Sequence, residues 1–163
     1  MKPQPPQDSQ RSASDPLAQA QVLAAALAAA VVVYAVVAWL VVDFLGGGAL
    51  AGGLPAPLPG VLVATAAVIL LIAPVVERRI VAPVRPGVAE AEGAADPAER
   101  YRLAKLVGFA LRETAAVIGL VVGLTTGEPR WTWAIAGGTL LLMALAWPRA
   151  GDLERSGGGP YRR

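Results

Sequence analysis

Long uncharged stretches dominate the pattern of polar and apolar positions along this chain. No charged residue occurs between Asp15 and Asp43, or between Asp43 and Glu77. A helix on the surface of a soluble protein carries a polar face along its whole length, and these stretches have almost none. Apolar runs of about 18 residues or more are typical of helices that cross a bilayer. The pattern therefore predicts membrane-spanning helices.

Four such helices are expected, over about 17–42, 61–76, 106–126 and 131–147. The loop 46–60 between the first two is rich in Gly and Pro, which interrupt helices. A short turn joins the last two. The predicted fold class is all-α: a polytopic membrane protein with four transmembrane helices arranged as two tandem helical hairpins.

The domain organisation follows from these helices. We expect a disordered cytoplasmic tail at 1–14, a first helical hairpin at 15–79, a cytoplasmic connection at 80–96, a second helical hairpin at 97–149 and a disordered cytoplasmic tail at 150–163. The tails lack large apolar residues. Each hairpin opens with Asp-Pro, a helix cap followed by proline at the first helical position. This shared order suggests an internal duplication, although helices rich in Ala, Val and Leu also resemble one another by chance.

The basic residues predict the orientation of the chain. Loops on the cytoplasmic side of a membrane carry an excess of Lys and Arg. Twelve of the fourteen basic residues fall in the two tails, the middle connection and its flanks, and only Arg130 falls on the other side. Glu77, Arg78 and Arg79 are expected to mark the water interface, after a bend at Pro74. We therefore expect a multi-pass protein of the bacterial plasma (inner) membrane with both termini cytoplasmic.

Composition narrows the chemistry. The chain has no cysteine and no histidine, which removes disulfides, thiol chemistry and the commonest general base and metal ligand. No phosphate-binding loop or nucleophile elbow is present. The net charge is only +2, and the basic residues flank apolar spans, so they indicate topology rather than nucleic-acid binding. We expect no enzymatic activity, no cofactor, no metal and no nucleic-acid partner.

The four tryptophans lie near the ends of predicted helices. Trp39 is near the end of the first, and Trp131, Trp133 and Trp147 flank the last. Tryptophan is enriched at membrane interfaces, so these residues favour an aromatic belt. Filling of gaps between helices is the alternative.

Arg112 and Glu113 are the only charged residues inside a predicted span. A charge at that depth costs at least about 2.5–3.5 kcal/mol, so both residues need partners. We expect Arg112 to extend toward the cytoplasmic surface. Glu113 is either a structural lock between helices or a site that binds a proton or sodium ion. It requires protonation, an arginine or a hydroxyl group, for which the candidates are Tyr34, Thr65, Thr114 and Thr139.

Small residues recur at every fourth position beside this pair. Ala115, Gly119, Gly123 and Gly127 form a stripe that allows close approach of another helix. The opposing surface is expected at Gly137 and Gly138, or in the alanine run 24–30.

The segment Glu113-Thr-Ala-Ala116-Val-Ile-Gly119-Leu120-Val-Val resembles the carboxylate-bearing helix of the proteolipid (c) subunit of rotary ATP synthases. That resemblance covers about a dozen residues. It implies an ion-binding role for Glu113 and close packing at Ala116 and Gly119. The whole chain resembles uncharacterised bacterial four-span membrane proteins, which implies no activity.

The expected role is therefore that of a small integral membrane protein with a non-enzymatic structural or accessory function. Its partners would be the lipid bilayer and either further copies of itself or subunits of a larger membrane complex. The alternative is a proton- or sodium-translocating proteolipid-like subunit that uses Glu113. A third hypothesis is a membrane-anchored regulator that acts through its cytoplasmic connection and tails.

Overall fold

The computed structural model describes residues 16–44, 55, 57–82 and 97–155. Nearly all of these residues are helical, and no β-strand occurs among them. The predicted all-α class is confirmed. The tail 1–14 and most of the connection 80–96 lie outside the described residues.

Three of the described helices begin at a proline, at Pro16, Pro97 and Pro129. Proline has a fixed φ and lacks an N–H that the first turn would leave unbonded, so it suits the first helical position. In chain order the elements are α2 (Pro16–Trp39), the π-helical turn η2 (Leu40–Phe44), α3 (Leu58–Val81), α4 (Pro97–Thr126), α5 (Pro129–Leu145) and α6 (Ala150–Arg155).

Three segments in the described part of the chain are long and apolar enough to cross a membrane: Leu17–Phe44, Leu58–Val81 and Glu99–Thr126. α5 has 17 residues, or roughly 25 Å of helix at 1.5 Å per residue. That length is at the lower end of the range for a transmembrane helix. Three helices of the described part of the chain are therefore candidate spans by length and composition, and a fourth span remains a prediction.

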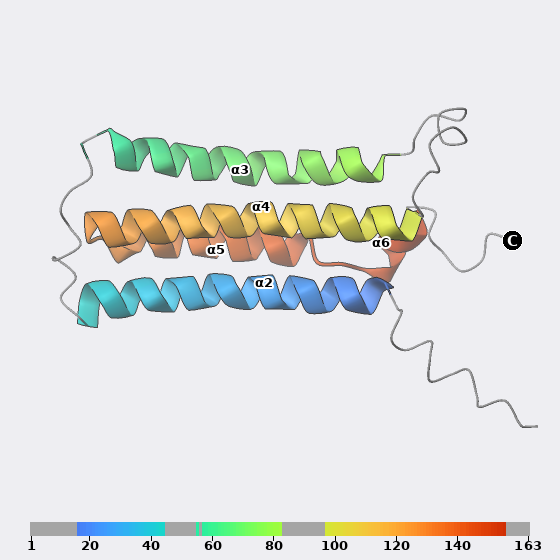
Figure 1. Cartoon of the computed structure of the whole chain (residues 1–163), viewed down its shortest axis with the longest axis horizontal. Coiled ribbons are helices and arrows are strands. Elements are labelled where there is room, and N and C mark those ends of the chain that lie inside the picture. Colours follow the sequence, from blue (N-terminus) through green and yellow to red (C-terminus); the bar gives the residue numbers. More distant parts are fainter. Residues whose placement is uncertain (1–15, 45–54, 56, 83–96, 156–163) are drawn as a thin grey trace, which may run out of the picture.

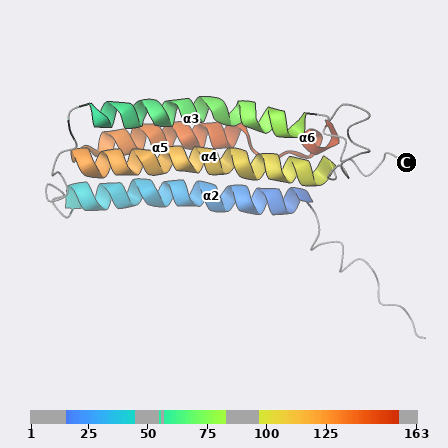
Figure 2. The same cartoon turned by 45° about the horizontal axis from the view of Figure 1, so that its top comes forward.

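α4 is the central helix of the bundle. α3 packs on one side of it, α2 on another, and α5 covers α4 while also contacting α2 (Figures 1 and 2). α2 and α3 lie on different sides of α4, so the hairpin arrangement predicted for 15–79 is not confirmed. Only the second hairpin, of α4 and α5, consists of packed neighbours, and the structure gives no support to a duplicated hairpin unit.

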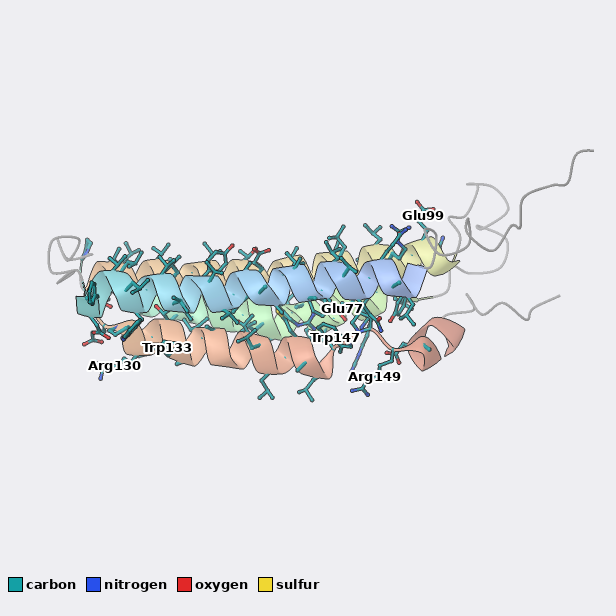
Figure 3. The ribbon with its side chains drawn as sticks, turned by 90° about the horizontal axis from the view of Figure 1, so that it is seen from below. Glu77, Glu99, Arg130, Trp133, Trp147 and Arg149 are labelled. Atoms are coloured by element: carbon teal, nitrogen blue, oxygen red, sulfur yellow. The ribbon has the colours of Figure 1, made fainter. Side chains whose placement is uncertain are left out.

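The two ends of the bundle differ in charge. The start of α2, the end of α3, the start of α4 and α6 all lie at one end (Figure 1). Figure 3 places Glu99 and Arg149 at this end and Arg130 at the opposite end. We call the first the basic end, defined by Arg78, Arg79, Arg100, Arg102, Lys105 and Arg149.

The interior is built from small side chains. One cluster of buried residues joins α2, α4 and α5, and most of its members are alanine or medium-sized apolar residues: Ala24, Val31, Ala35, Phe109, Ala116, Ala136 and Met143. α3 contributes only Ala66 and Ala73 as buried residues. Outward-facing side chains such as Leu71 and Val22 are more than 70% exposed. Many exposed, large apolar side chains are typical of a surface that contacts lipid or another protein.

Two boundaries differ from the prediction. α3 continues through Pro74 to Val81 and ends with the Ala82 N–H donating to the Arg78 carbonyl. Proline removes one backbone donor without stopping the helix here, so Glu77 lies inside α3 rather than at its end. The segment 150–163 was expected to be disordered, but 150–155 forms α6, in which the Asp152 N–H donates to the Arg149 carbonyl.

Candidate functional site

Arg112 and Glu113 occupy consecutive positions of α4 and therefore point to different neighbours. Successive residues on a helix are about 100° apart. This rotation directs Arg112 toward α3 and Glu113 toward α2, the two helices that α4 separates. The two charges do not pair with each other.

Arg112 forms an ion pair with Glu77 of α3. Its Nη1 donates to Glu77 Oε1, and the whole residue is only 3% exposed. Lys105 Nζ lies 3.6 Å from the other carboxylate oxygen, Glu77 Oε2, and donates to the Ala146 carbonyl at 3.0 Å. One carboxylate from α3 thus meets two cations from α4, which ties α3 to the central helix.

Arg112 does not extend to the cytoplasmic surface as predicted. Its guanidinium carbon lies 5.6 Å from the centre of the Phe109 ring, and its Nε has no hydrogen-bond partner among the described residues. The carboxylate of Glu77 reaches the arginine inside the bundle, so the arginine does not need water. Sequence reasoning missed Glu77 because Pro74 suggested that the helix was already ending.

Gly108 makes room for this ion pair. A Cβ built at that position would overlap the carboxylate of Glu77. Only glycine leaves the surface of α4 low enough for the acid of α3 to lie across it. The sequence signal was a glycine one helical turn before Arg112, on the same face.

Glu113 has a hydroxyl partner on α2. Tyr34 Oη donates to Glu113 Oε1 at 2.8 Å. Tyr34 was one of the four hydroxyl groups considered from the sequence. Thr65 and Thr114 instead donate to carbonyls of their own helices, at Val61 and Ala110. The buried hydroxyl of Thr139 has no partner among the described residues.

The stripe of small residues serves packing within the chain. Thr132 Oγ1 on α5 donates to the Gly119 carbonyl at 2.9 Å. A Cβ at Gly119 would come within 2.9 Å of Ile135 Cβ, and one at Gly123 would overlap Thr132 Oγ1. Ala115 is fully buried. The glycines therefore bring α5 close against α4.

Gly127 has a different role from the rest of the predicted stripe. Its φ of 69° is a left-handed conformation that favours glycine and ends α4. Gly137 and Gly138 do not oppose the stripe either, because a Cβ at each would meet nothing within 4 Å. In the alanine run 24–30, Ala24 is buried and joins the core.

The tryptophans divide between the two predicted roles. Trp39, Trp131 and Trp133 are exposed at the end opposite the basic end. There the Trp131 indole and the Arg130 guanidinium both donate to Glu128 Oε2, and these bonds lower the pKa of Glu128. Trp147 instead packs edge-on against Phe109, with ring centres 6.5 Å apart.

No protein-family model, curated protein or solved structure matches this chain. The roles of these residues therefore rest on geometry and physical chemistry. Among the described residues, no three acidic side chains gather closely enough to hold a metal ion. The charged groups that do meet form links between helices.

Proposed function

We propose that this chain is an integral protein of the bacterial plasma (inner) membrane with four spans and both termini cytoplasmic. Three long apolar helices and an outward apolar surface support insertion. The fourth span would be α5, which lies alongside α4 in the bundle. The concentration of basic residues at one end supports the orientation, because that end would face the cytoplasm.

Its role, in this proposal, is structural or accessory rather than enzymatic. The observation that carries this proposal is that the two charged residues of the predicted span 106–126 are engaged by two different helices. Arg112 is engaged by Glu77, and Glu113 by Tyr34. These polar groups join α3 and α2 to α4 and are not gathered around a shared cavity.

Replacing Tyr34 by Phe tests the structural role of Glu113. The substitution removes one hydroxyl and should lower the unfolding free energy by about 0.6 kcal/mol, the average for a hydrogen bond between membrane helices, and by at most about 1.7 kcal/mol. The measurement is an equilibrium SDS titration of the purified protein in mild detergent. Glu113→Leu should cost a similar amount, and the double variant little more than either alone. Fully additive losses would contradict a direct link between the two residues.

Assembly with further copies or with a larger complex would use the outer face of α5. Gly137 and Gly138 face open space there, next to the exposed Leu141. Small residues on a lipid-facing surface allow a second helix to approach closely. The stripe on α4 is not available for this purpose, because α5 already covers it.

Leucine at both Gly137 and Gly138 should block this approach. We expect the native mass in mild detergent to fall from an assembly to a single chain, while the helical content stays the same. The matched control is Gly60→Leu on α3, where a Cβ also meets nothing within 4 Å. A wild-type chain that is already monomeric would overturn the self-assembly proposal.

The second candidate function is ion binding at Glu113. It is favoured by one observation: Arg112 is directed to Glu77, so it does not neutralise the acid beside it. Among the described residues, Glu113 has Tyr34 as its hydrogen-bond partner and no ion pair.

A hydrophobic carbodiimide tests this candidate, because it modifies protonated carboxyl groups that are accessible from lipid. If Glu113 carries exchangeable protons, it should be labelled in membranes, with labelling lost at high pH or on addition of sodium ions. The fraction labelled is read by mass spectrometry of the intact chain. Glu113→Gln is the negative control. An unlabelled wild-type chain would remove this function.

A further inference from the structure

An amphipathic hollow lies between the first turns of α2 and the first three turns of α4, at the basic end. Its volume is about 310 Å³. A second hollow of about 560 Å³ adjoins it and shares Gln19, Leu23 and Arg102 with it. Neither Arg112 nor Glu77 lines these hollows, although Lys105 and Phe109 border both the first hollow and that ion pair.

The polarity of the first hollow is ordered along α4. Arg100 and Arg102 line its outer part, and Leu103, Leu106 and Phe109 line it further into the bundle. From Glu99 to Phe109 the helix rises about 15 Å, and only its last residues, from Leu106 on, belong to the predicted span 106–126. The hollow therefore has the polarity of the boundary between headgroups and acyl chains, with charge at the surface and apolar side chains below it.

The positive charge at the mouth is available for a ligand. Within the described part of the chain, neither Arg100 nor Arg102 is in a salt bridge. Lys105 also lines the hollow, but its ammonium contacts the Ala146 carbonyl and Glu77. Glu99, at the basic end (Figure 3), also lines the first hollow and offsets part of this charge. Two arginines with planar guanidinium groups suit a phosphate ligand.

We propose that these hollows bind an anionic phospholipid, with its phosphate at Arg100 and Arg102 and its acyl chains along Leu23, Leu103 and Leu106. Basic pockets between helices at the cytoplasmic surface are suited to acidic headgroups. A phospholipid fits the hollows better than inorganic phosphate does, because inorganic phosphate would leave the surrounding apolar side chains without a partner. This inference rests on the proposed membrane location and orientation, and adds a specific lipid site to it.

The test compares two lipids with identical acyl chains, phosphatidylglycerol and phosphatidylcholine, added to the full chain in mild detergent. Native mass spectrometry counts the lipids retained by each chain. We expect preferential retention of phosphatidylglycerol. The double variant Arg100→Gln and Arg102→Gln should weaken its binding by roughly fivefold for each arginine removed.

The matched control is Arg78→Gln with Arg79→Gln, which removes the same charge from the same end, on α3. Arg78, Arg79 and Arg102 are exposed and Arg100 is half-buried, so the helical content of both double variants is measured to show that they fold. The control should retain phosphatidylglycerol as the wild type does. If both double variants lost phosphatidylglycerol binding equally, general charge attraction would explain the binding, and the proposal of a specific site would be overturned.

Two further outcomes identify a different occupant. Displacement of phosphatidylglycerol by millimolar inorganic phosphate would assign the arginines to a free anion. The connection 80–96 contains Glu90 and Glu92. If lipid binding appears only after Glu90→Gln and Glu92→Gln, the two arginines would be assigned to these acidic residues of the chain itself. Either result overturns the proposal.

Carbonate extraction of membranes separates failure of this inference from failure of the proposed function. A chain that stays in the membrane pellet but binds both lipids equally contradicts the lipid site alone. A chain released into the soluble fraction contradicts the membrane location itself.

Discussion

Glu77→Leu should be among the most damaging single substitutions in this protein. It leaves the guanidinium of Arg112 buried without an anion, next to the ammonium of Lys105. Removing one partner of a buried ion pair typically costs about 3–5 kcal/mol, since the remaining charge keeps its desolvation penalty. We expect a loss of this size in the unfolding free energy, measured by SDS titration in mild detergent.

The double variant separates an unpaired charge from lost packing. Glu77→Leu combined with Arg112→Met removes both charges and keeps apolar volume between α3 and α4. Buried ion pairs replaced by well-packed apolar residues are often neutral or more stable, so most of the lost stability should return. Glu128→Gln is the control, because its ion pair with Arg130 is exposed and should contribute almost nothing. A double variant as unstable as Glu77→Leu would show that the charges are not the cause.

The partner of Arg112 was the main feature of the site that the sequence did not reveal. A single acid flanked by Pro74 and two arginines has the pattern of a helix end at a water interface. What the sequence lacks is the depth of α3 relative to α4, which is a tertiary property. The partner of Glu113 was easier to predict, because few hydroxyl groups lie within the spans and Tyr34 has the longest reach.

The lengths of the loops explain why α4 and α5 are packed neighbours while α2 and α3 lie on different sides of α4. α4 and α5 are joined through Gly127 and Glu128 alone, so they must be neighbours. The connection from Phe44 to Leu58 can extend to roughly 45 Å, while a helix is only about 10–12 Å in diameter. Such a loop permits α2 and α3 to be separated by another helix. The apolar pattern of the sequence predicts which segments are helices. Which helices pack together across a long loop depends instead on the shapes of the helix surfaces.

The surface shape of α4 depends on its glycines. The second large loss of stability is therefore expected for Gly119→Ala. The added Cβ would lie 2.9 Å from Ile135 Cβ and 3.0 Å from Ile135 Cγ2. A β-branched side chain cannot move these atoms aside by rotation about its distal bonds, so α5 must shift away from α4. We expect overpacking of this kind to cost about 1–3 kcal/mol. The SDS titration used for Glu77→Leu measures it.

Gly60→Ala provides the comparison, because it makes the same chemical change at a position of α3 where a Cβ meets nothing within 4 Å. There only the preference of alanine for helices operates, and that preference stabilises by about 0.5–1 kcal/mol. The two alanine variants should therefore differ in sign. If Gly119→Ala also stabilised the protein, the close contact between α4 and α5 would be contradicted. The explanation of how α4 holds α2, α3 and α5 around itself would then lose its basis. Helices that pack at ordinary distances would not require glycine at that contact.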